Sequence, residues 1–134
     1  MKKGKFLFIV LTGLLVLAMC NFSKYPEGDY SELTYLEIKG ESETDEWKSI
    51  KGKKQVNDIV GILQSSHWDK NVQEMSEAPE GMITLISEPD VEMERIYVWF
   101  DTTNQQTMLV AEGHGSGRLS KEEGAELKKK LTGN

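Results

Sequence analysis

The chain has few of the residues that cross-link small domains, with one cysteine and two histidines in 134 residues. A lone cysteine excludes an intramolecular disulfide. A transition-metal site needs three or four converging His, Cys, Asp or Glu ligands. His67 and Asp69 could supply two, but a histidine in the loop after a helix is the simpler interpretation, and His114 is far away in the sequence. We expect no metal and no other cofactor.

An excess of positive charge is also missing. The chain carries 16 Lys and Arg residues against 22 Asp and Glu residues, for a net charge of −6. Lys2, Lys3 and Lys5 belong to the amino-terminal segment, so the remainder keeps 13 basic side chains and a net charge of −9. A domain with that balance is repelled by nucleic acids and by anionic lipid headgroups. We therefore expect no nucleic-acid partner.

A third absence is an apolar run long enough to cross a membrane permanently. Phe6–Met19 has no charge, but as a helix its 14 residues span only roughly 21 Å, whereas the hydrocarbon core is ~30 Å thick. A short apolar run after a positive segment is typical of a secretory signal peptide. The positive end should stay in the cytoplasm, so we expect the rest of the chain to be exported.

The single cysteine follows this run directly. Leu17-Ala18-Met19-Cys20 resembles the lipobox of bacterial lipoproteins, in which the thiol receives a diacylglyceryl group and a signal peptidase cuts just before it. Met19 stands where that family prefers Gly, Ala or Ser. The resemblance implies that Cys20 is the lipidation site and that the acylated Cys20 anchors the chain in the lipid bilayer of the cell membrane. An uncleaved signal anchor and plain secretion are the alternatives, and all three place the domain outside the cytoplasm.

The chain should therefore have three parts. We expect residues 1–19 to be a lipoprotein signal peptide, residues 20–31 a tether and residues 32–134 a single domain. Asn21–Ser31 is polar, contains Pro26 and Gly28 and has no periodicity, which is typical of a flexible connection. The roughly 115 residues after the leader are enough for one hydrophobic core and too few for two.

The first half of the domain predicts two strands and a helix. Glu32–Gly40 and Trp47–Ile50 are rich in strand-forming residues. Lys53–Ser66 has an apolar stripe at helical spacing, formed by Val56, Ile59, Val60 and Leu63. Ile62 widens the stripe, and Gly61 is expected where the helix packs closely against another element.

Three strand candidates follow a polar stretch, at Met82–Ser87, Arg95–Asp101 and Thr107–Glu112. The middle one is almost entirely apolar or aromatic, so we expect a central strand covered on both sides. Thr102–Gln106 is a hairpin connection. A glycine-rich turn at Gly113–Gly117 then leads into a brief last strand at Arg118 and Leu119.

Ser120 opens a final helix, because Ser120 and Glu123 have the spacing of a capping box. Leu127 and Leu131 lie one turn apart and can dock on the sheet. The connections between the late strands are long enough only for hairpins, which makes the sheet antiparallel. We expect an α+β domain, with an antiparallel sheet of about five strands and two helices packed on one face.

Known catalytic patterns are incomplete in this chain. The glycine-rich stretch lacks the lysine and serine of a phosphate-binding loop. Ser116 cannot form a nucleophile elbow because His114 stands where that motif needs a glycine. Acid pairs such as Glu92/Glu94 or Glu122/Glu123 are expected in a chain with 22 acids, and solvated side chains are their simpler interpretation. We assign no catalytic residue.

Two further features are weak candidates for binding. A Ca²⁺ site in the acidic segment Glu41–Glu46 would lack the spacing and the glycine of an EF-hand. Trp47, Trp68 and Trp99 are more often core or rim residues than a ligand platform, although Trp47 or Trp68, beside loops, could line a binding groove.

The carboxyl-terminal stretch IYVWFDTTNQQTMLVAEGHGSGRLSKEEGAELKKKL resembles the end of small Gram-positive lipoproteins with YhfM-like domains. In those proteins a strand with a "VWF" element leads through a hairpin to a short "RLS" strand and a closing Lys/Leu helix. The resemblance covers residues 45–132. It implies a cell-envelope lipoprotein without a known reaction, and it transfers no catalytic residue.

Three functional hypotheses follow. The first is a non-enzymatic extracytoplasmic lipoprotein that binds another envelope component or protein. The second is an extracytoplasmic hydrolase or hydrolase inhibitor, and the third is a structural or immunity-type surface protein. A pocket with buried polar groups near His67 or His114 would favour the enzyme, whereas an exposed apolar patch or an open sheet edge would favour partner binding.

Overall fold

The computed structural model describes residues 25–39, 45–72, 74–87, 92–100, 102 and 104–133. The predicted leader and Cys20 lie outside these residues, as does most of the acidic segment Glu41–Glu46. Within the described part, no helix is both long enough and apolar enough to cross a membrane.

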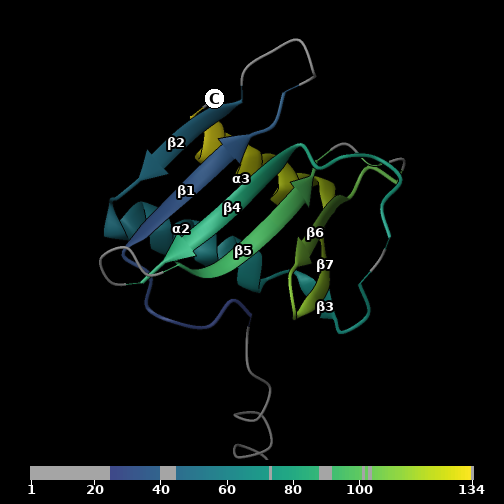
Figure 1. Cartoon of the computed structure of the whole chain (residues 1–134), viewed down its shortest axis with the longest axis horizontal. Helices are drawn as coiled ribbons and strands as arrows, with labels where there is room; N and C mark the ends of the chain where they lie inside the picture. The colour runs from purple at the N-terminus through teal and green to yellow at the C-terminus, as the bar shows by residue number, and fades with distance from the viewer. Residues whose placement is uncertain are drawn as a thin grey trace, which may run out of the picture.

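In the described part of the chain, seven strands form one sheet in which every neighbouring pair is antiparallel. The strands are β1 (Glu32–Glu37), β2 (Glu46–Ile50), β3 (His67–Asp69), β4 (Gly81–Ile86), β5 (Glu92–Trp99), β6 (Thr107–Ala111) and β7 (Gly115–Leu119). Their order across the sheet is β2-β1-β4-β5-β6-β7-β3, so β2 and β3 are its two edges (Figure 1).

Both helices, α2 (Lys53–Gln64) and α3 (Lys121–Thr132), lie on the same face of the sheet (Figure 1). The core lies between this helix layer and the side chains that the sheet directs toward it. Its fully buried aliphatic members are Leu33, Val56, Ile59, Leu63, Ile83, Leu85, Ile96, Val98, Leu109, Ala111, Leu119, Leu127 and Leu131. The predicted α+β class and the antiparallel sheet are therefore confirmed.

The described sheet has seven strands rather than about five. The sequence prediction lacked one of them, β3, and gave another, β7, too few residues. His67–Asp69, interpreted as a loop, is the edge strand β3. Gly115–Leu119 is strand β7, so most of the glycine-rich stretch is strand and not turn. A Cβ on Gly117 would overlap the Ser66 hydroxyl and lie 3.0 Å from the Trp68 ring, so this glycine is needed for β3 to pack on β7.

β5 is the middle strand of the seven, as predicted, but the helices cover only one of its faces. Ile96 and Val98 point toward the helices and are fully buried. Tyr97 and Trp99 alternate with them, point to the opposite face and are half-buried. Among the described elements, the expectation of helices on both sides is wrong, and the apolar pattern instead places aromatic side chains on the face opposite α2 and α3.

α2 has the predicted core stripe, with Val56, Ile59, Val60 and Leu63 buried. Ile62 packs against the core at its margin, also as predicted. Gly61, however, is exposed, and an added Cβ would meet no atom within 4 Å. The expectation of close packing at Gly61 is therefore wrong.

α3 begins with the predicted capping box. The Ser120 hydroxyl accepts a hydrogen bond from the backbone N–H of Glu123 (3.2 Å), and the Glu123 carboxylate accepts one from the backbone N–H of Ser120 (3.3 Å). Glu123 also accepts a hydrogen bond from the Ser65 hydroxyl (2.7 Å), which ties the end of α2 to the start of α3. Hydrogen bonds from Ser65 and then from Ser120 hold the pKa of Glu123 below its ordinary value.

Part of the segment expected to be a tether packs on the domain. Tyr25 and Tyr30 are only 6% and 2% exposed. The side-chain amide of Gln64, at the end of α2, donates a hydrogen bond to the carbonyl of Pro26 (2.8 Å). The chain therefore contacts the domain from Tyr25 onward, earlier than the boundary expected at Glu32. Residues 20–24 of the predicted tether lie outside the described residues.

Candidate functional site

An aromatic cluster joins the first described residue to the far end of the sheet. The ring of Tyr25 stacks on His114, with centroids 3.7 Å apart and planes at 18°. It meets Trp68 edge-on at 4.7 Å and 81°. The indole N–H of Trp68 in turn donates to the carbonyl of Leu63 in α2 (3.0 Å). The cluster thus holds the segment before β1 against β3 and the β6–β7 turn.

The hydroxyl of Tyr25 donates a 2.6 Å hydrogen bond to the carboxylate of Glu94. Burial raises the pKa of Tyr25 far above its ordinary value of 10.0, and the hydrogen bond and charge of Glu94 raise it further. Burial also raises the pKa of Tyr30 to about 12, with added repulsion from Glu94 and Glu27. Both phenols are therefore fixed as neutral donors near neutral pH, which suits a structural role and not proton transfer.

The histidine and serine residues considered in the sequence do not converge on a reaction centre. His114 stacks on Tyr25, whereas the Ser116 hydroxyl donates to the carbonyl of Asn71 (2.8 Å). His67 is exposed on β3, opposite Arg118 of β7. Asp69, on the same side of β3, accepts a hydrogen bond from the backbone N–H of Asn71 (3.0 Å). Among the described residues, no three His, Cys, Asp or Glu side chains form a metal-binding group.

The described members of the acid pairs from the sequence have structural surroundings of their own. Glu94 is the acceptor of Tyr25, while the side chain of Glu92 lies outside the described part. Glu123 belongs to the α3 capping box, while Glu122 is exposed in the first turn of the helix. Glu122 and Glu123 therefore do not form a carboxyl pair in an apolar pocket, the arrangement that acid–base catalysis by two carboxyl groups needs.

Two hollows lie at the margins of the helix layer. One, of about 240 Å³, lies between the start of α3 and the β5–β6 connection, and Phe100, Thr107 and Lys128 are among its lining residues. The other, of about 550 Å³, lies between β2 and both helices. No histidine lines either of them.

The larger hollow is rich in charge. Its lining includes Lys48, Lys51, Lys129 and Lys130, together with Asp58 and Glu126. The Lys130 Nζ atom lies 3.8 Å from the Asp58 Oδ2 atom. Lys129 and Lys130, in the last turn of α3, also complement the negative end of the helix dipole. These roles account for much of the charge without a ligand.

The face of the sheet opposite the helices carries a row of apolar side chains. Cross-strand pairing aligns Trp47 of β2, Leu36 of β1, Met82 of β4, Tyr97 of β5 and Val110 of β6. The four inner residues of this apolar row are half-buried, whereas Trp47 is 62% exposed. A row of this kind, with its exposed end at a sheet edge, is a candidate surface for another protein.

The three tryptophans have different surroundings. Trp68 is half-buried in the aromatic cluster, and the indole N–H of Trp99 donates to the carbonyl of Glu77 (2.9 Å). Trp47 is the most exposed large hydrophobic side chain among the described residues. Of the two tryptophans proposed to line a groove, Trp47 thus remains available to a partner.

Sequence reasoning missed the apolar row and the role of Tyr25. The residues of the apolar row come from five strands and are aligned only by the register of the sheet, so no local sequence pattern predicts the row. Tyr25 and Tyr30 stand in a polar stretch with Pro26 and Gly28, and two tyrosines in such a stretch were the available signal that it packs on the domain.

Comparisons of the chain with models of protein families, with curated proteins and with solved structures found no match.

Proposed function

We propose that this chain is a membrane-anchored extracytoplasmic lipoprotein whose domain is a non-enzymatic module that binds another protein of the cell envelope. The anchor is the acylated Cys20. Two acyl chains, each contributing about 0.8 kcal/mol per buried methylene, suffice for lasting attachment to a bilayer. The short apolar leader that ends at this cysteine supports export followed by lipidation.

The apolar row on the sheet face opposite α2 and α3 is the observation that carries the binding role. Trp47 lies at its exposed end and the half-buried Leu36, Met82, Tyr97 and Val110 continue it. Aromatic and Met side chains are enriched in protein interfaces, and charged residues are depleted at interface centres. The hydrolase alternative receives no such support, because His114 and Ser116 both have structural partners.

Affinity capture from membranes, with the lipidated full-length protein as bait, tests the binding role. Leu36→Lys introduces a charge into the apolar row and should abolish capture of the partner. Asn57→Lys adds the same charge on the exposed side of α2 and should leave capture unchanged. Circular dichroism of both variants verifies that the fold is intact. Equal capture by the parent protein and the Leu36→Lys variant would refute binding through this face.

The anchor is tested separately with Cys20→Ala. This variant should lose metabolic labelling by fatty acid and should be released from the membrane or processed differently. Unchanged labelling would rule out Cys20 as the acyl acceptor.

A further inference from the structure

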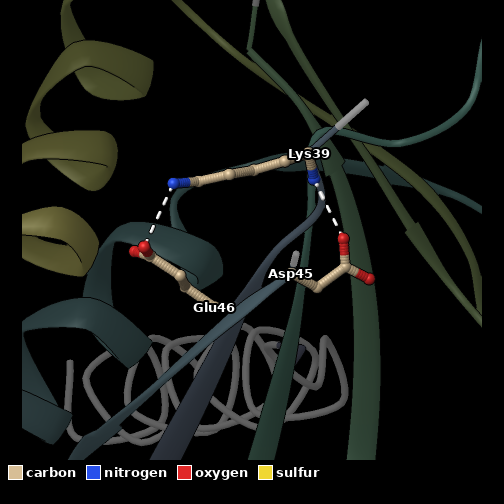
Figure 2. Close-up of polar contacts among 3 residues, drawn as sticks. All are labelled: Lys39, Asp45 and Glu46. Atoms are coloured by element: carbon tan, nitrogen blue, oxygen red, sulfur yellow. Dashed lines mark hydrogen bonds and ion pairs between the residues drawn. The ribbon is translucent and has the colours of Figure 1, made fainter. Parts of the chain in front are cut away.

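β2 has the backbone geometry of a strand that can accept another strand. Among the described strands, it is the last one on its side of the sheet. The N–H of Ile38 bonds to the carbonyl of Glu80 on the β4 side, whereas the N–H of Lys39 bonds to Asp45 on the β2 side (3.1 Å; Figure 2). Because these directions alternate along an antiparallel ladder, Glu46, Lys48 and Ile50 of β2 bond to β1. Asp45, Trp47 and Ser49 therefore direct their backbone N–H and C=O groups outward from the sheet.

We propose that this edge pairs with the β2 edge of a second copy of the chain, antiparallel and about a two-fold axis at Trp47. In that register Trp47 lies opposite Trp47 of the second copy and bonds to it through both backbone groups. Glu46 lies opposite Lys48 of the second copy, and Lys48 lies opposite its Glu46. These two pairs occupy non-hydrogen-bonded positions, where opposite side chains are closest.

The charges on β2 select this register. Proteins commonly place charged residues on edge strands to prevent pairing. Here, however, Glu46 and Lys48 have opposite signs and point to the same side, so a two-fold axis between them brings unlike charges together twice. Moving the axis by one residue, to Lys48, would set two lysines opposite each other and place Trp47 against Ser49. Only the axis at Trp47 pairs both charges and both aromatic rings.

Trp47 contributes more than its own ring contact. It lies at the end of the apolar row, so two rings that meet at the axis would join the rows of two copies into one band. Aromatic side chains directly opposite each other stabilise antiparallel strands. The other edge of the sheet is a poorer template, because β3 has only three residues.

The arrangement is compatible with one membrane for both copies. Tyr25 packs on Trp68, whose indole bonds to α2, so the chain reaches the domain on its helix face. A two-fold axis perpendicular to the sheet leaves the helices and Tyr25 of both copies on the same face. The two Cys20 anchors, each of which precedes a Tyr25 in the chain, can then enter the same bilayer. Confinement to a bilayer raises the effective concentration, which assists an interface built on a five-residue strand.

A charge exchange tests the pairing. The assay is energy transfer between two fluorescently labelled populations of the full-length lipoprotein in phosphatidylcholine–phosphatidylglycerol vesicles. Glu46→Lys and Lys48→Glu each place like charges opposite each other twice and should weaken pairing about tenfold. The double variant exchanges the charges and should return to within about twofold of the parent. Within one chain, Lys39 contacts Glu46 at 3.1 Å (Figure 2). The double variant does not restore this contact, so a recovery of pairing would report the contact between the two copies.

Trp47→Lys should reduce energy transfer to the level of unpaired protein. Val72→Lys is the matched control, since Val72 is also an exposed apolar residue, at 56%, but lies far from β2 in the sequence and outside the sheet. The proposal is overturned if the parent shows no energy transfer beyond random encounter. It is also overturned if the double charge variant stays as weak as the single variants.

Cysteine cross-linking in membranes tests the register. Asp45 lies opposite Ser49 of the second copy in a hydrogen-bonded pair, with Cα atoms about 5.5 Å apart, within reach of a disulfide. Mixed Asp45→Cys and Ser49→Cys proteins should therefore cross-link. Ser49→Cys alone should not, because its two copies are roughly 14 Å apart. Cross-linking of Ser49→Cys alone, or none in the mixture, would overturn this register. A chain that does not self-pair but still captures a partner refutes this inference and not the proposed function.

Discussion

A buried phenol next to a carboxylate connects the amino-terminal segment to the sheet. Tyr25 is 6% exposed and its hydroxyl donates to Glu94 at 2.6 Å. Both the burial and the negative charge favour the neutral phenol, so the group stays a donor over the whole physiological pH range. The Tyr25 hydroxyl stabilises the Glu94 carboxylate strongly, because hydrogen bonds to charged groups are stronger than those between neutral groups.

Tyr25→Phe should lower the free energy of unfolding by about 1–3 kcal/mol, because a partly buried carboxylate loses its donor while the aromatic stacking remains. Tyr97→Phe is the control, since it removes an exposed hydrogen bond to Glu112 of 3.0 Å and should change stability by less than about 0.5 kcal/mol. Urea denaturation of both variants measures the difference. Equal losses would show that the buried bond contributes no more than the exposed one.

The same substitution at two glycines should act in opposite directions. Gly61→Ala places a methyl group in open space on a helix and should stabilise the domain by about 1 kcal/mol. Gly117→Ala forces a methyl group against Ser66 and Trp68 and should destabilise it by about 1–3 kcal/mol. Thermal melts of the two variants provide the test, and a loss of stability at Gly61 would contradict its exposed position.

At the scale of elements, one carboxylate links the end of α2 to the start of α3. Glu123 closes the capping box of α3 and also accepts the Ser65 hydroxyl from the end of α2. Removing the cap with Ser120→Ala should cost about 1 kcal/mol of stability. Glu123 thus stabilises the start of α3 and also holds α3 beside the end of α2.

The pH dependence of this contact has a defined sign. Since the folded-state pKa of Glu123 is lowered from 4.5, its contribution is present above pH 4.5 and is lost as the pH falls below that value. Glu123→Gln should be less stable than the parent at pH 7, and the difference should shrink with acidification. Urea titrations across this range measure it. Parallel profiles of parent and variant would exclude a role of the Glu123 charge.

Elements with local signals could be predicted from the sequence, and elements defined by distant pairing could not. The stripe through Val56 and Leu63 indicated α2, and the spacing of Ser120 and Glu123 indicated the start of α3. β3 could not be predicted because three residues carry no periodicity and the described strand with which it pairs, β7, follows much later in the chain. Trp47 was a candidate from its sequence neighbours, but its place in the apolar row depends on the strand register.

At the scale of the whole molecule, three buried phenols limit stability in alkali. Burial is the largest cause of the raised pKa of Tyr25, and it raises the pKa of Tyr30 and Tyr35 to about 12. Folded-state values above the ordinary 10.0 mean that the neutral groups stabilise the fold fully below pH 10. That stabilisation is lost as the pH rises through 12 and beyond.

The free energy of unfolding should therefore fall steeply above pH 10. Tyr25→Phe should show a shallower fall than the parent, because one of the three groups can no longer ionise on unfolding. Guanidinium titrations between pH 9 and pH 12 test this, with absorbance of phenolate reporting ionisation. Identical slopes for parent and variant would mean that Tyr25 ionises as easily in the folded protein as in the unfolded chain.

The packing of Tyr25 against Trp68 and His114 limits how far the domain could lie from Cys20. From Cys20 to Tyr25 a fully extended chain covers at most about 18 Å. A domain attached to lipid at Cys20 would therefore work within one protein layer of the headgroups and could not search the outer envelope. The molecules it meets would be those that are themselves embedded in the bilayer or that diffuse down to its surface.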